Sequence, residues 1–91
     1  MRQKTKSKKK SQNFIWLLNS DAEAVYLAGD FNNWIPASMA RLDGCFQAIV
    51  ELYPGEHQYK FVVDGQWRND PAATKSVTNV FGTMNSVVQV N

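Results

Sequence analysis

The sequence predicts an all-β protein, an antiparallel β-sandwich made of one domain. Its 91 residues leave room for a single small domain. Short apolar or alternating segments follow one another from residue 14 onward, without the periodicity of a long helix. The turn dipeptides Asp43-Gly44, Pro54-Gly55 and Asp64-Gly65 separate these segments at a spacing of about ten residues, which is typical of antiparallel sandwiches.

Six segments carry the expected strands, because each is apolar or alternates between apolar and polar residues. In chain order they are Phe14–Leu18, Ala24–Ala28, Cys45–Leu52, His57–Val63, Gln66–Arg68 and Ser86–Val90. If Pro54-Gly55 forms a two-residue loop, the third and fourth segments form a hairpin with one apolar face. In that hairpin Val50 is expected to face Tyr59, Ala48 to face Phe61, and Phe46 to face Val63.

The Asp64-Gly65 dipeptide predicts a second hairpin, because Asp-Gly suits a two-residue type I′ turn. Such a turn places Val62 opposite Trp67. Trp67 then lies on the outer face of the sheet, diagonally beside Lys60. A large aromatic ring next to a lysine on the solvent side is not what core packing alone predicts.

The charge is unevenly distributed along the chain. The net charge is +2, yet six of the ten basic residues lie within the first ten positions. Residues 1–13 are expected to be a flexible basic tail, with an anion-binding arm as the alternative. Residues 14–91, the expected folded body, carry four basic and eight acidic residues, so 4 − 8 gives a net charge of −4. This excludes a basic folded nucleic-acid-binding domain and leaves the tail to make non-specific contacts with polyanions.

The single cysteine, Cys45, excludes an internal disulfide and a cysteine-based zinc cluster. No cofactor and no metal ion are expected. No apolar stretch approaches the ~20 residues that span a bilayer, and the five residues from Phe14 to Leu18 are too few for a secretory signal. The expected location is therefore the cytoplasm.

Catalytic residues are scarce. His57 is the only histidine, and it begins an expected strand. The aspartates at 30, 43, 64 and 70 lie beside Gly, Phe or Pro, where an Asp side chain stabilises a turn. An enzyme is therefore not expected.

The three tryptophans have different expected environments. Trp16 shares the apolar face of its strand with Phe14 and is expected in the core. Trp34 ends a polar loop, where it either caps the core or faces solvent. Trp67 is expected to be exposed, and exposed rings of this size commonly mark a binding surface.

Four sequence blocks resemble a known family. They are Gly29-Asp30-Phe31-Asn32-Asn33-Trp34, the stretch from Pro54 to Trp67, Asp70-Pro71, and the stretch from Gly82 to Val88. In order and spacing they are similar to the family 48 carbohydrate-binding modules, in particular the glycogen-binding domains of AMP-activated protein kinase beta subunits. The resemblance covers residues 14 to 90. It implies an immunoglobulin-like β-sandwich of the early-set type that binds α-1,4-glucans such as glycogen, starch and maltodextrin without catalysis.

The resemblance also implies the residues that contact the sugar. Two tryptophans match the stacking rings, a lysine, a threonine and an asparagine match groups that bind hydroxyls, and a phenylalanine replaces the usual leucine of the last loop. These residues are Trp34, Lys60, Trp67, Phe81, Thr83 and Asn85. Because Phe81 is bulkier than leucine, the resemblance leaves the preference for chain curvature or branches open.

Two properties of the kinase subunits are not expected to carry over. The resemblance does not include the domain with which those subunits dock their partners, so kinase scaffolding is not implied. A regulatory serine of animal relatives is matched by Leu42, so no phosphorylation switch is expected there. The expected partner is an α-glucan, together with a glycogen-metabolising enzyme or a kinase. The alternative is a protein-interaction module of the same fold with a vestigial sugar site.

Overall fold

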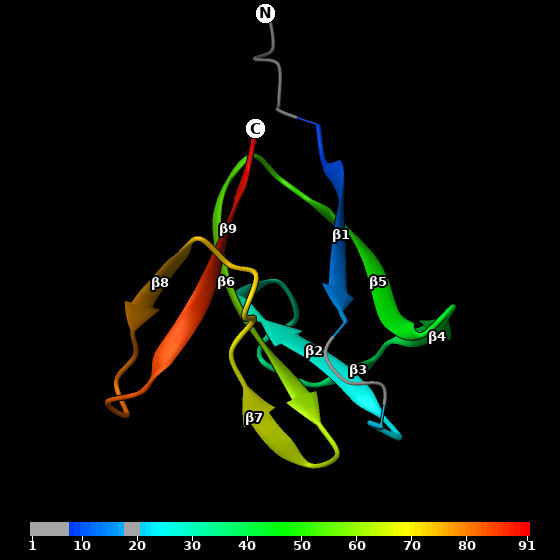
Figure 1. Cartoon of the computed structure of the whole chain (residues 1–91). Helices are drawn as coiled ribbons and strands as arrows, with labels where there is room; N and C mark the ends of the chain where they lie inside the picture. Colours follow the sequence, from blue (N-terminus) through cyan, green and yellow to red (C-terminus); the bar gives the residue numbers. More distant parts are fainter. Residues whose placement is uncertain (1–7, 18–20) are drawn as a thin grey trace, which may run out of the picture.

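Two antiparallel sheets face each other in the computed structural model, which describes residues 8–17 and 21–91 (Figure 1). The first sheet has the order β1-β5-β4, and the second has the order β3-β2-β6-β9-β8 with β7 also paired to β6. This is the all-β sandwich predicted from the spacing of the turns. The only helical element among the described residues is η1, three residues long, so no helix there could span a membrane.

The first sheet is formed around β5 (Cys45–Leu52). On one side β5 pairs with β1 (Lys10–Trp16) along the whole length of β1, and on the other with β4 (Ala40–Leu42). Residues 10–13 were expected to belong to the tail, so the boundary placed at residue 13 is wrong. These residues are polar, but an edge strand needs only backbone hydrogen bonds, and its polar side chains can face water. Residues 1–7 of the expected tail, and Leu18 of the expected first strand, lie outside the described residues.

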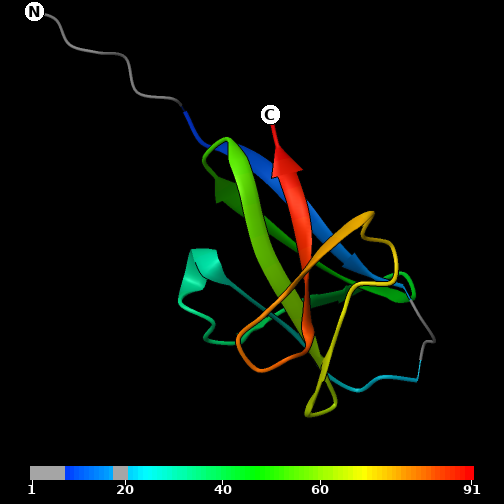
Figure 2. The same ribbon diagram turned by 90° about the vertical axis from the view of Figure 1, so that its left-hand side faces the viewer.

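The second sheet is formed around β6 (Gly55–Val63), which pairs with three strands. β2 (Val25–Gly29) lies on one side of β6, and β9 (Met84–Val90) on the other; in Figure 2 β6 and β9 run side by side. The shorter strands β3 (Ala37–Ser38), β7 (Gln66–Arg68) and β8 (Lys75–Thr78) complete the sheet. The helical turn η1 (Asp30–Asn32) follows β2 directly.

The core lies between the two sheets and is rich in aromatic rings. Trp16 of β1 meets Phe61 of β6 edge to face at 5.2 Å between ring centroids, and Phe14 meets Tyr59 in the same way at 4.8 Å. Phe61 is fully buried and Trp16 is only 5% exposed, so the core placement predicted for Trp16 is confirmed. Such edge-to-face pairs add to the stabilisation that burial alone gives.

The hairpin predicted across Pro54-Gly55 is wrong. β5 and β6 belong to different sheets, and the chain crosses from one to the other at the turn near the top of Figure 1. Val50 therefore does not pair with Tyr59; its neighbour on β1 is Gln12. The predicted inner face is nevertheless right, since Phe46 and Tyr59 are both buried in the core. Alternation fixes which face of a strand is buried, whereas it does not fix the strand's partner.

The Asp64-Gly65 hairpin is confirmed, with Val62 opposite Trp67. Both turn residues have positive φ, +49° and +84°, as a type I′ turn requires. The strands β3, β4 and β8 were not predicted, because they are two to four residues long and consist mostly of exposed residues. A strand this short has too few residues to show an alternating pattern. β7 is as short, but the Asp64-Gly65 turn identified it.

The buried hydroxyl of Tyr59 should make the stability of the protein depend on pH. Its hydroxyl donates to Asp70 Oδ2 at 2.6 Å, and burial together with this hydrogen bond raises the pKa of Tyr59 above its ordinary value of 10.0. A raised pKa in the folded state gives stability that is complete below pH 10 and is lost as the pH rises further. We expect the wild-type free energy of unfolding to fall above about pH 10, by up to ~1.4 kcal/mol per pH unit for this group.

The matched control is Tyr59→Phe, which keeps the ring and removes the ionisable hydroxyl. Urea unfolding between pH 8 and pH 12 measures both proteins. The difference between them should shrink as the pH rises. A constant difference across that range would show that the Tyr59 hydroxyl does not titrate differently in the folded and unfolded chains.

Candidate functional site

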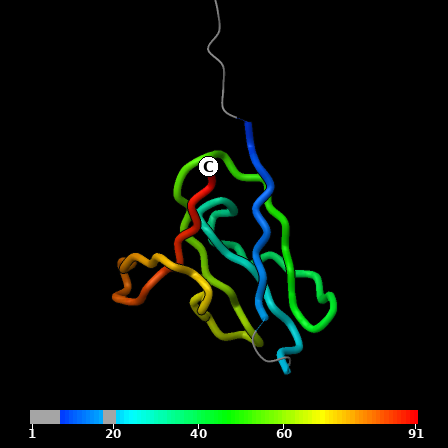
Figure 3. The backbone as a smooth tube through the Cα atoms, turned by 45° about the horizontal axis from the view of Figure 1, so that its top comes forward, coloured from blue at the N-terminus to red at the C-terminus, as the bar shows by residue number. Residues whose placement is uncertain are grey.

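A groove of about 910 Å³ lies on the outer face of the second sheet. It is lined by residues from the η1 loop, from β6, β7 and β9, and from the hairpin that joins β8 to β9 and projects from the body (Figure 3). All six residues predicted for the site line this groove. The lining is Trp34, Gln58, Lys60, Trp67, Thr78, Asn79, Val80, Phe81, Thr83 and Asn85.

The strands β6 and β7 place a ring and a cation beside each other in the groove. Lys60 and Val62 alternate with the buried Phe61 and so lie on the outer face of β6, and Trp67 pairs with Val62. Trp67 is 49% exposed. The lining contains no carboxylate, and Lys60 is its only charged side chain. The groove therefore offers aromatic faces and hydrogen-bond donors, without the carboxylate pair that a glycoside hydrolase uses.

Trp34 is partly buried and has an unusual backbone conformation. It follows η1 with φ = +60°, directly after Asn33 at +58°. Asn tolerates this left-handed conformation, whereas for a bulky side chain it costs about 1–2 kcal/mol. Two backbone bonds hold the turn, from Trp34 N to Gly29 O at 2.9 Å and from Ile35 N to Asn32 O at 3.1 Å. Trp34 was expected either to cap the core or to face solvent. In the structure it lines the groove on the outer face of the second sheet.

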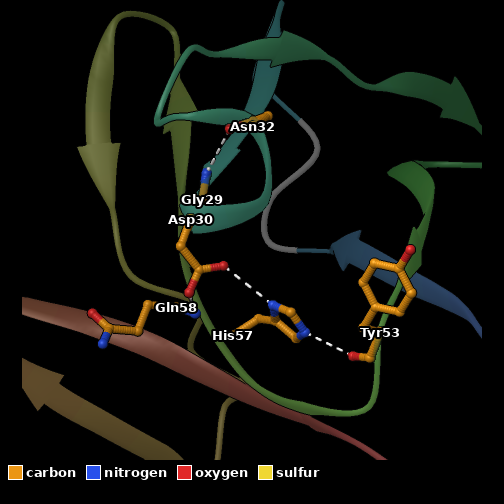
Figure 4. A network of polar contacts seen from close by, with 6 residues as sticks. All are labelled: Gly29, Asp30, Asn32, Tyr53, His57 and Gln58. Atoms are coloured by element: carbon orange, nitrogen blue, oxygen red, sulfur yellow. Dashed lines mark hydrogen bonds and ion pairs between the residues drawn. The ribbon is translucent and has the colours of Figure 1, made fainter. Parts of the chain in front are cut away.

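A network of polar contacts attaches the η1 turn to β6 (Figure 4). Asp30 Oδ2 accepts from Gln58 N at 2.9 Å, and Asp30 Oδ1 lies 3.2 Å from His57 Nδ1. The other ring nitrogen of His57 lies 2.8 Å from the carbonyl oxygen of Tyr53. Within the turn, Gly29 N donates to Asn32 Oδ1 at 3.0 Å. These contacts fix the start of the Trp34 loop relative to β6, and they give Asp30 and His57 structural roles.

Gly29 is required at the start of this turn because the space for a side chain is already filled. A Cβ there would lie 2.6 Å from Phe31 Cζ and 2.7 Å from the Gln58 carbonyl oxygen. We expect Gly29→Ala to lower the free energy of unfolding by about 1–3 kcal/mol, since backbone atoms of β6 would have to shift. Chemical unfolding measures this effect. Asn33→Gly is the control, because glycine accepts positive φ without strain; an equal loss in both variants would contradict this reason.

Asn79 organises the hairpin loop between β8 and β9. Its Oδ1 accepts from the backbone nitrogens of Phe81 at 2.9 Å and Thr83 at 3.1 Å. Its Nδ2 donates to Thr83 Oγ1 at 2.7 Å and to Asn85 Oδ1 at 2.9 Å. All four hydrogen-bonding positions of the Asn79 amide are thus used within the protein. These hydrogen bonds support the loop, in which Val80 and Phe81 are 92% and 86% exposed.

Asn85 is more deeply placed than the sequence indicated. It is 6% exposed, and its Nδ2 donates to Gln58 Oε1 at 3.0 Å. Asn79 and Gln58 were not predicted as site residues. Gln58 could have been found, since it lies two residues before Lys60 and therefore shares the outer face of β6 with it. Asn79 gave no signal beyond that of a polar residue in a turn.

A second, smaller hollow of about 500 Å³ lies near the β5–β6 turn, beside the Asp30–His57 contact. Lys9 Nζ lies 5.0 Å from the centre of the Tyr53 ring there, and Ser11 Oγ donates to Glu51 at 2.6 Å. Its polar groups thus bond to neighbours within the chain. Within residues 8–17 and 21–91 no three His, Cys, Asp or Glu side chains gather as they would around a metal ion.

The fold and the groove define the class of the protein, a β-sandwich with an aromatic groove on the outer face of one sheet. Comparison with protein families gives the particular family. The chain belongs to the family described as the glycogen recognition site of AMP-activated protein kinase, whose model matches residues 11–91.

Curated relatives agree with this assignment. The chain is 47% identical over 77 residues to 5'-AMP-activated protein kinase subunit beta-1 of Sus scrofa, covering 85% of this chain and 61% of that sequence. To the Homo sapiens beta-1 subunit it is also 47% identical over 77 residues, covering 27% of that subunit. To the Mus musculus beta-2 subunit it is 48% identical over 69 residues, covering 72% of this chain and 24% of that subunit. The chain therefore spans only part of the length of these relatives.

Solved structures share the fold at low sequence identity. A maltogenic amylase from S. marinus matches 91% of this chain with a TM-score of 0.73 and 22% identity, over 14% of its own length. The enterobactin esterase FES from Shigella flexneri matches 97% of this chain with a TM-score of 0.74 and 15% identity, over 32% of its own length. These likenesses concern the fold alone.

Proposed function

We propose that this protein binds α-1,4-glucans such as glycogen, starch and maltodextrin in the groove of the second sheet, without chemical conversion. The observation that carries the proposal is the convergence of the six sequence-predicted residues on one groove, in a member of the glycogen recognition family. Trp34 lies in the loop after η1, Lys60 on β6 and Trp67 on β7, so their meeting is a property of the fold.

The groove suits a glucose polymer in its chemistry. Glucose rings have apolar C–H faces and a rim of hydroxyl groups. The Trp34 and Trp67 rings would cover those faces. Lys60, Thr83 and Asn85 would bind hydroxyls. Phe81 is 86% exposed at the end of a hydrogen-bonded loop and would enter the turn of a curved glucan. Because two rings and a few hydrogen bonds form a small contact, we expect Kd values of about 1 µM to 1 mM for oligosaccharides.

Co-sedimentation with glycogen tests this function. The full chain should sediment with glycogen and amylopectin, and soluble maltoheptaose should release it. Cellulose is the control, since its straight β-linked chains present a flat ribbon to the protein. A chain that stays in the supernatant at every glycogen concentration, or that sediments equally with cellulose, would contradict an α-glucan site.

The partners and the location are part of the same proposal. The similarity to beta subunits of AMP-activated protein kinase supports a partner kinase or a glycogen-metabolising enzyme, which the module would bring to a glucan in the cytoplasm. A protein-interaction module with a vestigial sugar site is the alternative. It would be favoured if the full chain bound a kinase subunit and failed to bind glycogen.

A further inference from the structure

The orientation of three side-chain amides beside the groove follows from the backbone. A backbone nitrogen can only donate, and two of them, from Phe81 and Thr83, point at Asn79 Oδ1. This fixes which end of the Asn79 amide is oxygen. The nitrogen end, Nδ2, must then donate to Asn85, so the Asn85 atom that it meets at 2.9 Å is the oxygen.

The same reasoning extends to Gln58. With Asn85 Oδ1 directed at Asn79, Asn85 Nδ2 donates in the other direction, to Gln58 Oε1 at 3.0 Å. The Nε2 group of Gln58 is therefore the end of a chain of amides that begins at the backbone of the β8–β9 loop. Among the described residues, no group accepts a hydrogen bond from Gln58 Nε2.

Gln58 is well placed to use its free amide hydrogens. It lines the groove next to Lys60, and Figure 4 shows its side chain extending away from the Asp30–His57 contact. Its backbone nitrogen is held by Asp30 at 2.9 Å, and its Oε1 by Asn85. Both ends of the residue are thus fixed, so little side-chain freedom remains to be lost when a ligand binds.

We propose that Gln58 is a further sugar-contacting residue, whose Nε2 donates hydrogen bonds to glucan oxygens in an orientation set by Asn79 and Asn85. This inference rests on the proposed function. It also means that these side chains present hydrogen-bond donors to the groove. Thr83 Oγ1 accepts a hydrogen bond from Asn79, so the proton of the Thr83 hydroxyl points away from Asn79 and can be donated to a ligand. The ammonium group of Lys60 can only donate. The protein would supply donors, and the glucan oxygens would accept.

The test uses maltoheptaose and calorimetric titration of the full chain. Gln58→Glu keeps the side-chain length and the oxygen that accepts from Asn85, and it removes both Nε2 hydrogens. We expect an affinity about 3- to 10-fold weaker than wild type, with a melting temperature within a few degrees of it. Gln47→Glu is the matched control, because it makes the same change on a partly buried residue of the other sheet, and it should bind as wild type does.

Nuclear magnetic resonance gives a second readout, which is taken on the wild-type protein and does not depend on the affinity of a variant. The Nε2 hydrogen signals of Gln58, identified by their disappearance in Gln58→Glu, should shift when maltoheptaose is added. If wild type binds while Gln58→Glu binds equally well, or while the Nε2 signals stay fixed, the role of Gln58 is wrong and the glucan site stands. If wild type itself does not bind, the proposed function fails as well.

Discussion

Trp67→Ala is expected to weaken binding of maltoheptaose about 10- to 100-fold, or about 1.4–2.8 kcal/mol, while leaving the fold intact. Trp67 is 49% exposed on β7, a three-residue strand that pairs only with β6. Removing its side chain would take away a stacking surface without opening a cavity in the core. Calorimetric titration with maltoheptaose and a thermal melt of the same sample measure the two effects.

Tyr53→Ala is the matched control for this prediction. Tyr53 is also aromatic and 50% exposed, but it lies at the β5–β6 turn, outside the groove. Its removal should leave glucan affinity unchanged. If Trp67→Ala melted far below wild type and the folded protein still bound maltoheptaose normally, Trp67 would be a structural residue. The interaction-module alternative would then explain the protein better.

Trp16→Ala is expected to have the opposite effect, lowering the free energy of unfolding by about 3–5 kcal/mol. Trp16 is 5% exposed and packs edge to face on Phe61, in the middle of the core. The total stability of a domain is about 5–15 kcal/mol, so this variant would be close to unfolding. Urea unfolding measures the loss, and glucan affinity of the folded fraction should remain near that of wild type.

Trp16→Phe distinguishes the contribution of the aromatic ring from that of the indole N–H group. The indole Nε1 of Trp16 is buried, and it has no hydrogen-bond partner within the described part of the chain. Phenylalanine keeps an aromatic ring against Phe61 and removes the unpaired donor, so we expect a loss of only about 1 kcal/mol. A loss as large as that of Trp16→Ala would show that Nε1 has a partner essential to the fold.

The fold class and the position of Trp67 could be predicted from the sequence because both depend on local rules. Turn dipeptides at regular spacing indicate an antiparallel sandwich, and Asp-Gly fixes the register of a two-residue hairpin. Val62 opposite Trp67 is the result. The partner of β5 could not be predicted in the same way, because the alternation that buries Phe46 is equally compatible with pairing to β1 or to β6.

The groove itself depends on contacts between distant parts of the chain. Trp34 lines it because two consecutive residues adopt positive φ, a conformation that a Trp side chain does not favour and that local sequence rules therefore do not predict. The link from Asn79 through Asn85 to Gln58 joins a loop to a strand 21 residues away. Only the family resemblance pointed to Asn85 as a site residue. It assigned no such role to Asn79, which orients Asn85, or to Gln58, which Asn85 orients.

The three indole N–H signals in a proton–nitrogen correlation spectrum test the central claim most directly, because two of the tryptophans report on the groove and the third reports on the core. Trp34 and Trp67 line the groove, and Trp16 lies in the core. On titration with maltoheptaose, the Trp34 and Trp67 signals should shift together along one saturation curve while the Trp16 signal remains in place. Unchanged Trp34 and Trp67 signals at saturating maltoheptaose, or shifts confined to residues of the β1-β5-β4 sheet, would contradict a glucan site in this groove.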